Sequence, residues 1–288
     1  MRGIVLILIT ISTLLGNLKI YSPKAPPSIP LFNREYKGVT IDLYDRFNTA
    51  ILPKIVKGEE ALYIIPTNVA AKLFNKGIDI SILATLSEGL LFFCSKEDKR
   101  LSEIKDKTIY VPAKGSSPDV ITNIIIKKSQ NIKIKYSSAP EIAKLMKAGR
   151  IDFSVLPQPL ASMVESDNIK IFDMKKDWGK TDGEFTIPQV SIVAFNSILE
   201  SKKIELNKFL IDFEKEIKKI NESEELNFER LQPIGWKLSK NNLKRSLKKM
   251  NLTFNNNFQS VKVYLEKLYK KDPKLIGGKI PSEKFYKK

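Results

Sequence analysis

The segment KGSSPD, residues 114–119, has the residue types of a loop that can hold an anion. It follows a predicted strand and leads into a predicted helix, with Ser117 as the N-cap and a proline at the first helical position. Free N–H groups there favour an anion or a carbonyl oxygen, and Gly115 next to Ser116 would let the backbone approach it. The same residues also fit an ordinary capped helix, in which Asp119 offsets part of the helix dipole. Both interpretations stay open.

Other predicted strands also end in short polar or proline-containing segments. Ligands of open α/β sheets bind beyond the carboxyl ends of the strands, so these segments are candidate parts of one site. The candidates are Ser22, Pro23 and Lys24 in the loop that runs to Ser28, Thr67 and Asn68, Ser117, Ser138, and Pro157 with Gln158. Ser138 also starts an S-x-x-E capping box, and Thr67 with Asn68 fits a helix cap, so structural roles compete with binding roles.

The sequence offers little to catalysis. Histidine is absent, which excludes Ser-His-Asp and Cys-His nucleophile systems and every histidine-ligated metal site. The one cysteine, Cys94, lies in an apolar run and is expected to be a buried strand residue rather than a reactive thiol. We therefore expect no catalytic residues, no metal site and no cofactor.

The formal net charge of +17 suggests a partner that is a nucleic acid, an anionic membrane or an anionic solute. The lysines, however, are scattered along the chain and are not interleaved with aromatic residues as in single-strand binders. Lysine, isoleucine and asparagine are abundant throughout, which is also typical of a general compositional bias. We expect no nucleic-acid partner.

Strand and helix patterns alternate along most of the chain, which predicts an α/β fold with mainly parallel sheets. Strands are expected at 18–23, 39–45, 61–66, 78–86, 90–95, 107–112, 131–137, 151–157, 169–174 and 190–196. The chain then becomes helical, with helices expected at 204–220, 239–250 and 256–270. We expect one lobe from 18–95 and 190–288, interrupted by a second lobe at 96–189.

The first 17 residues have the pattern of an export signal. Arg2 precedes a 12-residue apolar stretch from Ile4 to Leu15, which is too short to span a bilayer. A buried first strand is the competing interpretation. We expect export to the periplasm or the cell surface, with the mature chain starting near Leu18.

Four ordered segments resemble the type II periplasmic binding proteins, in the group that binds nitrate, aliphatic sulfonates, taurine and thiamine pyrimidine. The segments are Leu62 to Ala71 (LYIIPTNVAA), Asp106 to Asp119 (DKTIYVPAKGSSPD), Ala148 to Ala161 (AGRIDFSVLPQPLA) and Pro188 to Val193 (PQVSIV). Their order and spacing match over residues 18–200, about two thirds of the chain. The stretch between Ile29 and Gly38 is shorter than the first helix usual in this family.

The resemblance implies a two-lobed fold with a discontinuous first lobe and a ligand in the cleft between the lobes. It implies hinge crossings near residues 94–97 and 187–190, and it assigns Gly115, Ser116, Pro157, Gln158 and Gln189 to the cleft. It also implies delivery of the captured solute to the permease and ATPase of an ABC importer. Two alternatives share the fold: a ligand-sensing module, and an enzyme similar to thiamine-pyrimidine synthase, whose histidine and cysteine-rich motif this chain lacks.

The sequence leaves the ligand open. An anionic solute would use N–H donors and the cations Lys24, Arg46 or Lys114. A planar heterocycle would need aromatic walls, for which the candidates are Tyr21, Tyr44, Phe47 and Phe92. We expect the protein to act as a monomer.

Overall fold

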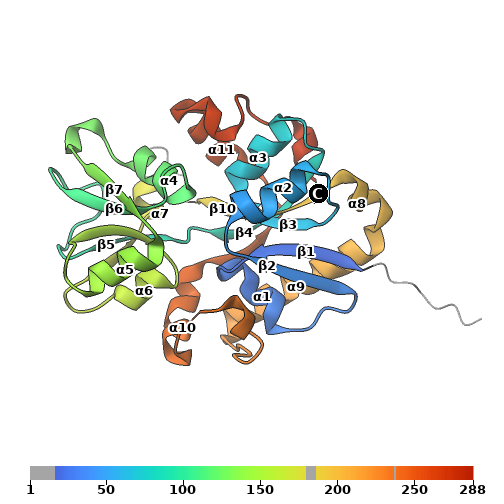
Figure 1. The fold of residues 1–288 in the computed structure, drawn as a ribbon, viewed down its shortest axis with the longest axis horizontal. Coiled ribbons are helices and arrows are strands. Elements are labelled where there is room, and N and C mark those ends of the chain that lie inside the picture. Colours follow the sequence, from blue (N-terminus) through green and yellow to red (C-terminus); the bar gives the residue numbers. More distant parts are fainter. Residues whose placement is uncertain (1–16, 180–185, 237, 288) are drawn as a thin grey trace, which may run out of the picture.

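The computed structural model describes residues 17–179, 186–236 and 238–287. Two mixed sheets, each flanked by helices, lie beside one another (Figure 1). The predicted export signal, apart from Asn17, lies outside the described residues. Among the described residues, no helix has the length and hydropathy needed to cross a membrane.

The first sheet has six strands in the order β11-β4-β10-β3-β1-β2. The strands are β1 (Leu18–Pro23), β2 (Val39–Tyr44), β3 (Leu62–Pro66), β4 (Ile80–Glu88), β10 (Pro188–Phe195) and β11 (Leu252–Asn255). β1 runs parallel to β2 and β3, whereas β10 is antiparallel to β3 and β4. The sheet thus combines strands from the beginning of the chain with strands that follow residue 187.

The second sheet has five strands in the order β7-β6-β8-β5-β9. They are β5 (Leu91–Ser95), β6 (Thr108–Pro112), β7 (Lys133–Ser137), β8 (Phe153–Pro157) and β9 (Lys170–Asp173). β6 is parallel to β7 and β8, and β5 is antiparallel to both β8 and β9. The predicted α/β class is confirmed, and most strands of each sheet run in one direction, with β10 and β11 of the first sheet and β5 of the second running against them.

The strand expected at 90–95 in the first lobe is β5, which belongs to the second sheet. β5 pairs with β8 and β9, so the expectation that it extends the first lobe was wrong. Only Gly89 and Leu90 separate β4 from β5, so the first passage between the sheets lies there and not near residues 94–97. A strand buried along its whole length shows no preference for one core over another, so the sequence of β5 could not indicate its sheet.

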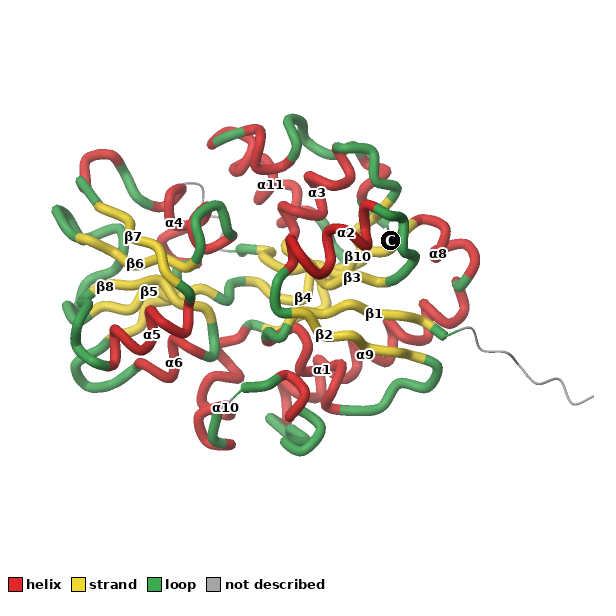
Figure 2. Tube along the Cα trace, viewed as in Figure 1, coloured by secondary structure: helices red, strands yellow, loops and turns green. Residues whose placement is uncertain are grey.

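Helices cover both faces of each sheet (Figures 1 and 2). On the first sheet, α3 (Thr67–Asn75) and α11 (Gln259–Lys271) lie on one face, and α1 (Ile29–Asn33) and α9 (Lys203–Ser223) on the other. On the second sheet, α4 (Ser117–Ile125) and α7 (Lys175–Trp178) lie opposite α5 (Ala139–Lys147) and α6 (Leu160–Val164). The remaining α-helices are α2 (Leu52–Val56), α8 (Asn196–Ser201) and α10 (Lys240–Leu247).

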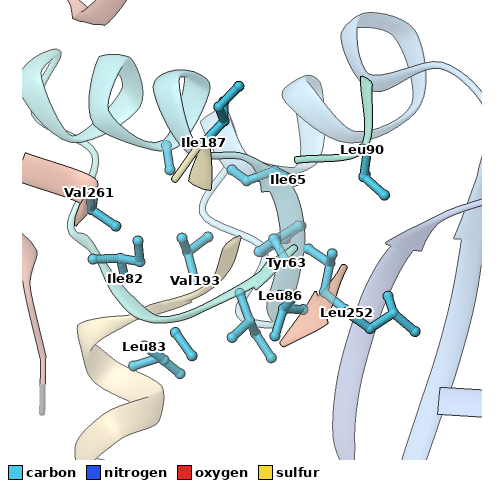
Figure 3. Close-up of a cluster of buried hydrophobic side chains, with 14 of the residues drawn as sticks. Tyr63, Ile65, Ile82, Leu83, Leu86, Leu90, Ile187, Val193, Leu252 and Val261 are labelled. Carbon is cyan, nitrogen blue, oxygen red and sulfur yellow. The ribbon is translucent and has the colours of Figure 1, made fainter. Parts of the chain in front are cut away.

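The hydrophobic core continues through both passages between the sheets. Leu90 and Ile187 are buried together with Tyr63, Val193 and Leu252 of the first sheet (Figure 3). A smaller cluster around Ile142, Met146 and Leu156 fills the space between α5, α6 and the second sheet. The strand ends on either side of the two passages are therefore anchored by a continuous hydrophobic core.

Candidate ligand-binding site between the two sheets

The carboxyl ends of the parallel strands in both sheets point toward the boundary between them (Figure 2). β4 continues into β5 through two residues, and the first residue of β5, Leu91, lies opposite the last residue of β8, Pro157. The segments after β1, β3, β6, β7 and β8 thus lie along two facing edges. All the predicted site residues lie on these edges, at strand ends, in the segments just after them, or at the start of β10.

Leu90 links two of the candidates directly. The Gln189 side-chain oxygen accepts a hydrogen bond from the Leu90 N–H at 2.6 Å, and the Leu90 carbonyl accepts one from the Gln158 N–H at 2.9 Å. Gln158 is only 2% exposed, and its side-chain oxygen accepts a long hydrogen bond of 3.4 Å from the Ser162 N–H. Its Nε2 has no hydrogen-bond partner among the described residues. A donor is therefore buried at the boundary without an acceptor.

A second group adjoins this one on the first sheet. Val190 of β10 pairs with Pro66 at the end of β3, so Thr67 and Asn68 lie next to Gln189. The Thr67 hydroxyl is 2.7 Å from the hydroxyl of Ser191, a residue that the sequence did not single out. Asn68 is 7% exposed, and its Oδ1 has no partner among the described residues.

Two such unpaired polar atoms are costly. A buried donor or acceptor without a partner costs about 1–3 kcal/mol, and most buried polar atoms in folded proteins are paired. A bound polar molecule that accepts from Gln158 and donates to Asn68 would remove that cost. Gln158 and Asn68 are the candidates whose geometry most favours a binding role.

The loop before α4 is occupied by its own aspartate. The N-cap is Ser116 and not Ser117, which is the first helical residue, so this prediction was wrong by one position. Gly115, at φ +78°, donates its N–H to Asp119 Oδ2 at 2.8 Å, and the Ser116 hydroxyl donates to the Pro112 carbonyl at 2.7 Å. The Asp119 carboxylate thus lies where an anion would bind, while the Ser116 side chain makes no capping hydrogen bond to α4.

Local contacts also hold the other loops. The Ser22 and Ser28 hydroxyls are 2.6 Å apart, and Lys24 forms a 2.9 Å ion pair with Asp45 on its exposed loop. The Ser138 hydroxyl accepts a 3.3 Å hydrogen bond from the Glu141 N–H as the N-cap of α5. Ser22 is fully buried in the fold of its own loop, whereas Lys24 and Ser138 are exposed on the facing edges.

Three of the four aromatic candidates belong to the core instead of a ligand wall. Tyr21 stacks on Tyr63 with ring centroids 5.3 Å apart, and Phe92 is buried in the smaller core cluster. Tyr44 is buried and donates its hydroxyl to the Ile64 carbonyl at 2.7 Å, and this burial raises the pKa of Tyr44 well above its usual value. Phe47 alone stands at a facing edge, half-buried directly after β2.

A further aromatic residue reaches the site from the C-terminal part of the chain. The Trp236 indole donates a 3.3 Å hydrogen bond to the Lys24 carbonyl at the end of β1. Pro233, three residues earlier, lines a hollow of about 490 Å³ beside Tyr44 and Lys54. This C-terminal loop lies beside the short α1. The only signal in the sequence was a second tryptophan after a proline and a glycine, QPIGW.

Several solved structures with the same architecture are ligand-binding proteins, among them a ligand-binding component of an ABC-type import system from Staphylococcus aureus. The chain superimposes on an ABC transporter protein from Parabacteroides distasonis with a TM-score of 0.76 and 20% identity, over 94% of this chain and 98% of that one. It superimposes on the periplasmic aliphatic sulphonate binding protein of Escherichia coli with a TM-score of 0.70 and 12% identity, over 92% of each. A Candida albicans protein with the generic periplasmic binding protein fold also matches, at a TM-score of 0.54 and 16% identity, over 94% of each.

The sequence itself matches no known family model and no curated protein. At these identities the superpositions show the fold and leave the ligand open. All three superpositions cover more than nine tenths of this chain, so they extend over both sheets. The chain has the two-lobed α/β fold of the type II periplasmic binding proteins.

Proposed function

We propose that this protein is the solute-binding component of an ABC importer. It captures a small molecule between the two sheets and delivers it to a permease driven by an ATPase. The ligand is an anion or a planar heterocycle, held by Gln158, Gln189, Thr67 and Asn68. The other contacts come from Ser22, Pro23, Lys24, Gly115, Ser116, Ser117, Ser138 and Pro157 on the facing edges.

The observation that carries this proposal is the pair of unpaired buried atoms, Gln158 Nε2 and Asn68 Oδ1. They come from different sheets, yet Leu90 and Gln189 connect their surroundings through hydrogen bonds. A molecule bound there would contact both sheets at once. Such a molecule would favour an arrangement in which the two edges approach each other, as capture and release require.

An enzyme of the same fold is the weaker alternative. General acid–base and nucleophilic catalysis use a positioned titratable or nucleophilic group within hydrogen-bond reach of the substrate. Most groups at this boundary are carboxamides, hydroxyls and backbone groups, Lys24 is paired with Asp45 and the Asp119 carboxylate accepts from Gly115, and Cys94 is buried with its pKa raised to about 12 by that burial. This chemistry suits binding without reaction. A ligand-sensing module would use the same site, and the predicted export signal favours the importer.

Binding is tested with a thermal-shift screen of sulfonates, nitrate, bicarbonate, pyrimidines and flavins, followed by calorimetry on each compound that stabilises the protein. Gln158→Leu keeps the side-chain volume but removes the donor. We expect its affinity for the identified compound to fall about 5- to 150-fold, the equivalent of a lost hydrogen bond of about 1–3 kcal/mol. Its melting temperature without ligand should not fall, because the variant buries no unpaired Nε2.

Gln130→Leu is the matched control. Gln130 is equally buried, but its Nε2 donates to the Leu101 and Ile104 carbonyls at 2.8 and 2.9 Å, away from the facing edges. This variant should lose stability and keep its affinity. An unchanged affinity in Gln158→Leu would remove Gln158 from the site.

Permease and ATPase genes beside this gene would support the proposed partners. A mature chain that retains Met1 in the cytoplasm would contradict export.

A further inference from the structure

Helix α9 presents a basic outer face. Its inner face is buried against the first sheet through Leu206, Phe209, Phe213, Ile217 and Ile220. The exposed residues of the first five turns form the α9 outer face, which consists of Lys203, Ile204, Asn207, Lys208, Ile211, Lys215, Lys218 and Lys219. The acidic residues of the same stretch, Glu205, Asp212, Glu214 and Glu216, are half-buried or buried. Glu214 pairs with Lys218 at 2.8 Å.

The two isoleucines on this face are unusually exposed. Ile204 is 80% and Ile211 is 53% accessible to solvent, and their spacing of seven residues places both on one side of the helix. Ile211 also borders a hollow of about 570 Å³ with Leu199, Leu210 and Phe254. Exposed apolar side chains rimmed by lysines are typical of surfaces that bind a membrane or another protein, and the lysines here complement the charge of anionic lipid phosphates.

The position of this face in the chain points the same way. The Lys202 ammonium, one residue before α9, donates a 2.8 Å hydrogen bond to the Asn17 carbonyl, and β1 begins at Leu18. The apolar stretch Ile4 to Leu15 therefore joins the described fold beside the start of α9. Until the predicted export signal is removed, the start of α9 is therefore near the membrane in which that signal lies.

We infer that the α9 outer face binds the surface of a membrane that contains anionic lipids. The lysine ammonium groups contact lipid phosphates, and Ile204 and Ile211 enter the boundary between headgroups and acyl chains. Lysines near an anionic surface contribute about 1 kcal/mol each, roughly fivefold in partitioning per residue. The inference is independent of solute binding, since the residues of the facing edges take no part in it.

The test uses residues 17–288, which contain every element of both sheets and both core clusters. Binding to vesicles of phosphatidylcholine with one third phosphatidylglycerol is measured by co-sedimentation at low and high salt, and compared with pure phosphatidylcholine. We expect binding only to the anionic vesicles and release at high salt.

The triple variant Lys203→Gln, Lys208→Gln, Lys215→Gln should bind at least about tenfold more weakly. Ile204→Ser with Ile211→Ser should also bind more weakly while the net charge is unchanged.

A matched control separates this face from the general positive charge of the protein. Lys270→Gln, Lys274→Gln, Lys279→Gln removes the same charge from exposed positions in and after α11 and should bind like the unaltered chain. Equal losses in the two triple variants would overturn the inference in favour of unspecific attraction. Absence of vesicle binding, together with self-association that Ile204→Ser and Ile211→Ser abolish, would overturn it in favour of a second copy of the chain.

Discussion

At the scale of single residues, the Glu59 carboxylate beside the first sheet is held by three neighbouring side chains. Its carboxylate accepts hydrogen bonds from the Tyr21 hydroxyl, from the Lys19 ammonium at 3.0 Å and from the Lys54 ammonium at 3.1 Å. The hydrogen bond from Tyr21, followed by those of the two lysines, lowers the pKa of Glu59 to about 2. Glu59 thereby connects β1 to the end of α2.

Glu59→Gln should lower the free energy of unfolding at pH 7 by about 1–2 kcal/mol, a value reduced for the partial exposure of the site. Because the folded-state pKa is lower than the unfolded one, this stabilisation is present above pH 4.5 and disappears as the pH falls toward 2. Urea unfolding at pH 7, 4.5 and 3 should show the difference between the two proteins shrinking. Glu35→Gln, at an exposed pair 3.9 Å from Arg230, should change stability by less than about 0.5 kcal/mol at any pH.

At the scale of elements, the alternating pattern of the sequence was sufficient for most strands and for the long helices. The helix expected at 204–220 is α9, Lys203–Ser223, because its apolar residues recur with helical period. The pattern missed β11, since four residues with a half-buried face carry almost no periodic signal. The pattern also could not assign β5 to one of the two sheets, because a strand buried on both faces lacks the alternation of apolar and polar residues that would indicate which core it faces.

The candidate site was predictable in its location and much less so in its contacts. Strand ends could be read from the sequence, and the rule that ligands bind beyond them selected the facing edges. The sequence could not show that Asp119 takes the Gly115 N–H, or that Tyr21 turns to Glu59, because both contacts depend on side-chain directions. Nor could it bring Trp236 to Lys24, since 212 residues separate them.

The connection between β4 and β5 depends on a glycine. Gly89 has a φ of +103°, and a methyl group there would lie 2.5 Å from Cδ of Lys175, whose ammonium donates to Asn251 Oδ1 at 3.1 Å. Gly89→Ala should therefore strain the backbone and displace Lys175 from Asn251. We expect a loss of about 2–4 kcal/mol in the free energy of unfolding, measured in urea.

Gly58→Ala provides the comparison for that prediction. Gly58 has a φ of +76°, but an added methyl group meets nothing within 4 Å. Only the backbone strain of about 1–2 kcal/mol should remain in this variant. Equal losses at the two positions would show that Lys175 moves aside at no cost.

At the scale of the whole molecule, the C-terminal part of the chain ties the two sheets together on opposite sides. Near α10, Lys249 pairs with Glu165 at 2.7 Å, at the end of α6. On the other side, the Lys271 ammonium of α11 donates to the Asn123 carbonyl of α4 at 2.7 Å. Any rotation of one sheet relative to the other has to stretch or break these contacts.

Glu165→Gln should loosen this arrangement. It weakens the contact with Lys249 at a partly exposed position, so the free energy of unfolding should fall by less than about 1 kcal/mol. The radius of gyration of the ligand-free protein, measured by X-ray scattering, should nevertheless increase. Glu141→Gln, whose partner Lys144 is 4.0 Å away in the same helix, should leave it unchanged. A radius that does not respond to Glu165→Gln would mean that other contacts hold the sheets in place.

Cys94 gives this molecule a built-in reporter of its own opening. The thiol lies on β5, between β8 and β9 of the second sheet, with no exposed surface, and its burial raises its pKa to about 12. A thiol reagent can therefore modify it only during the moments when that sheet opens. When the sheet recloses faster than the reagent reacts, the ratio of the Cys94 modification rate to that of a free thiol gives the equilibrium constant for opening, without denaturant. If the Cys94 modification rate is measured again with each compound of a solute screen, it will report how far binding suppresses the opening of the second sheet.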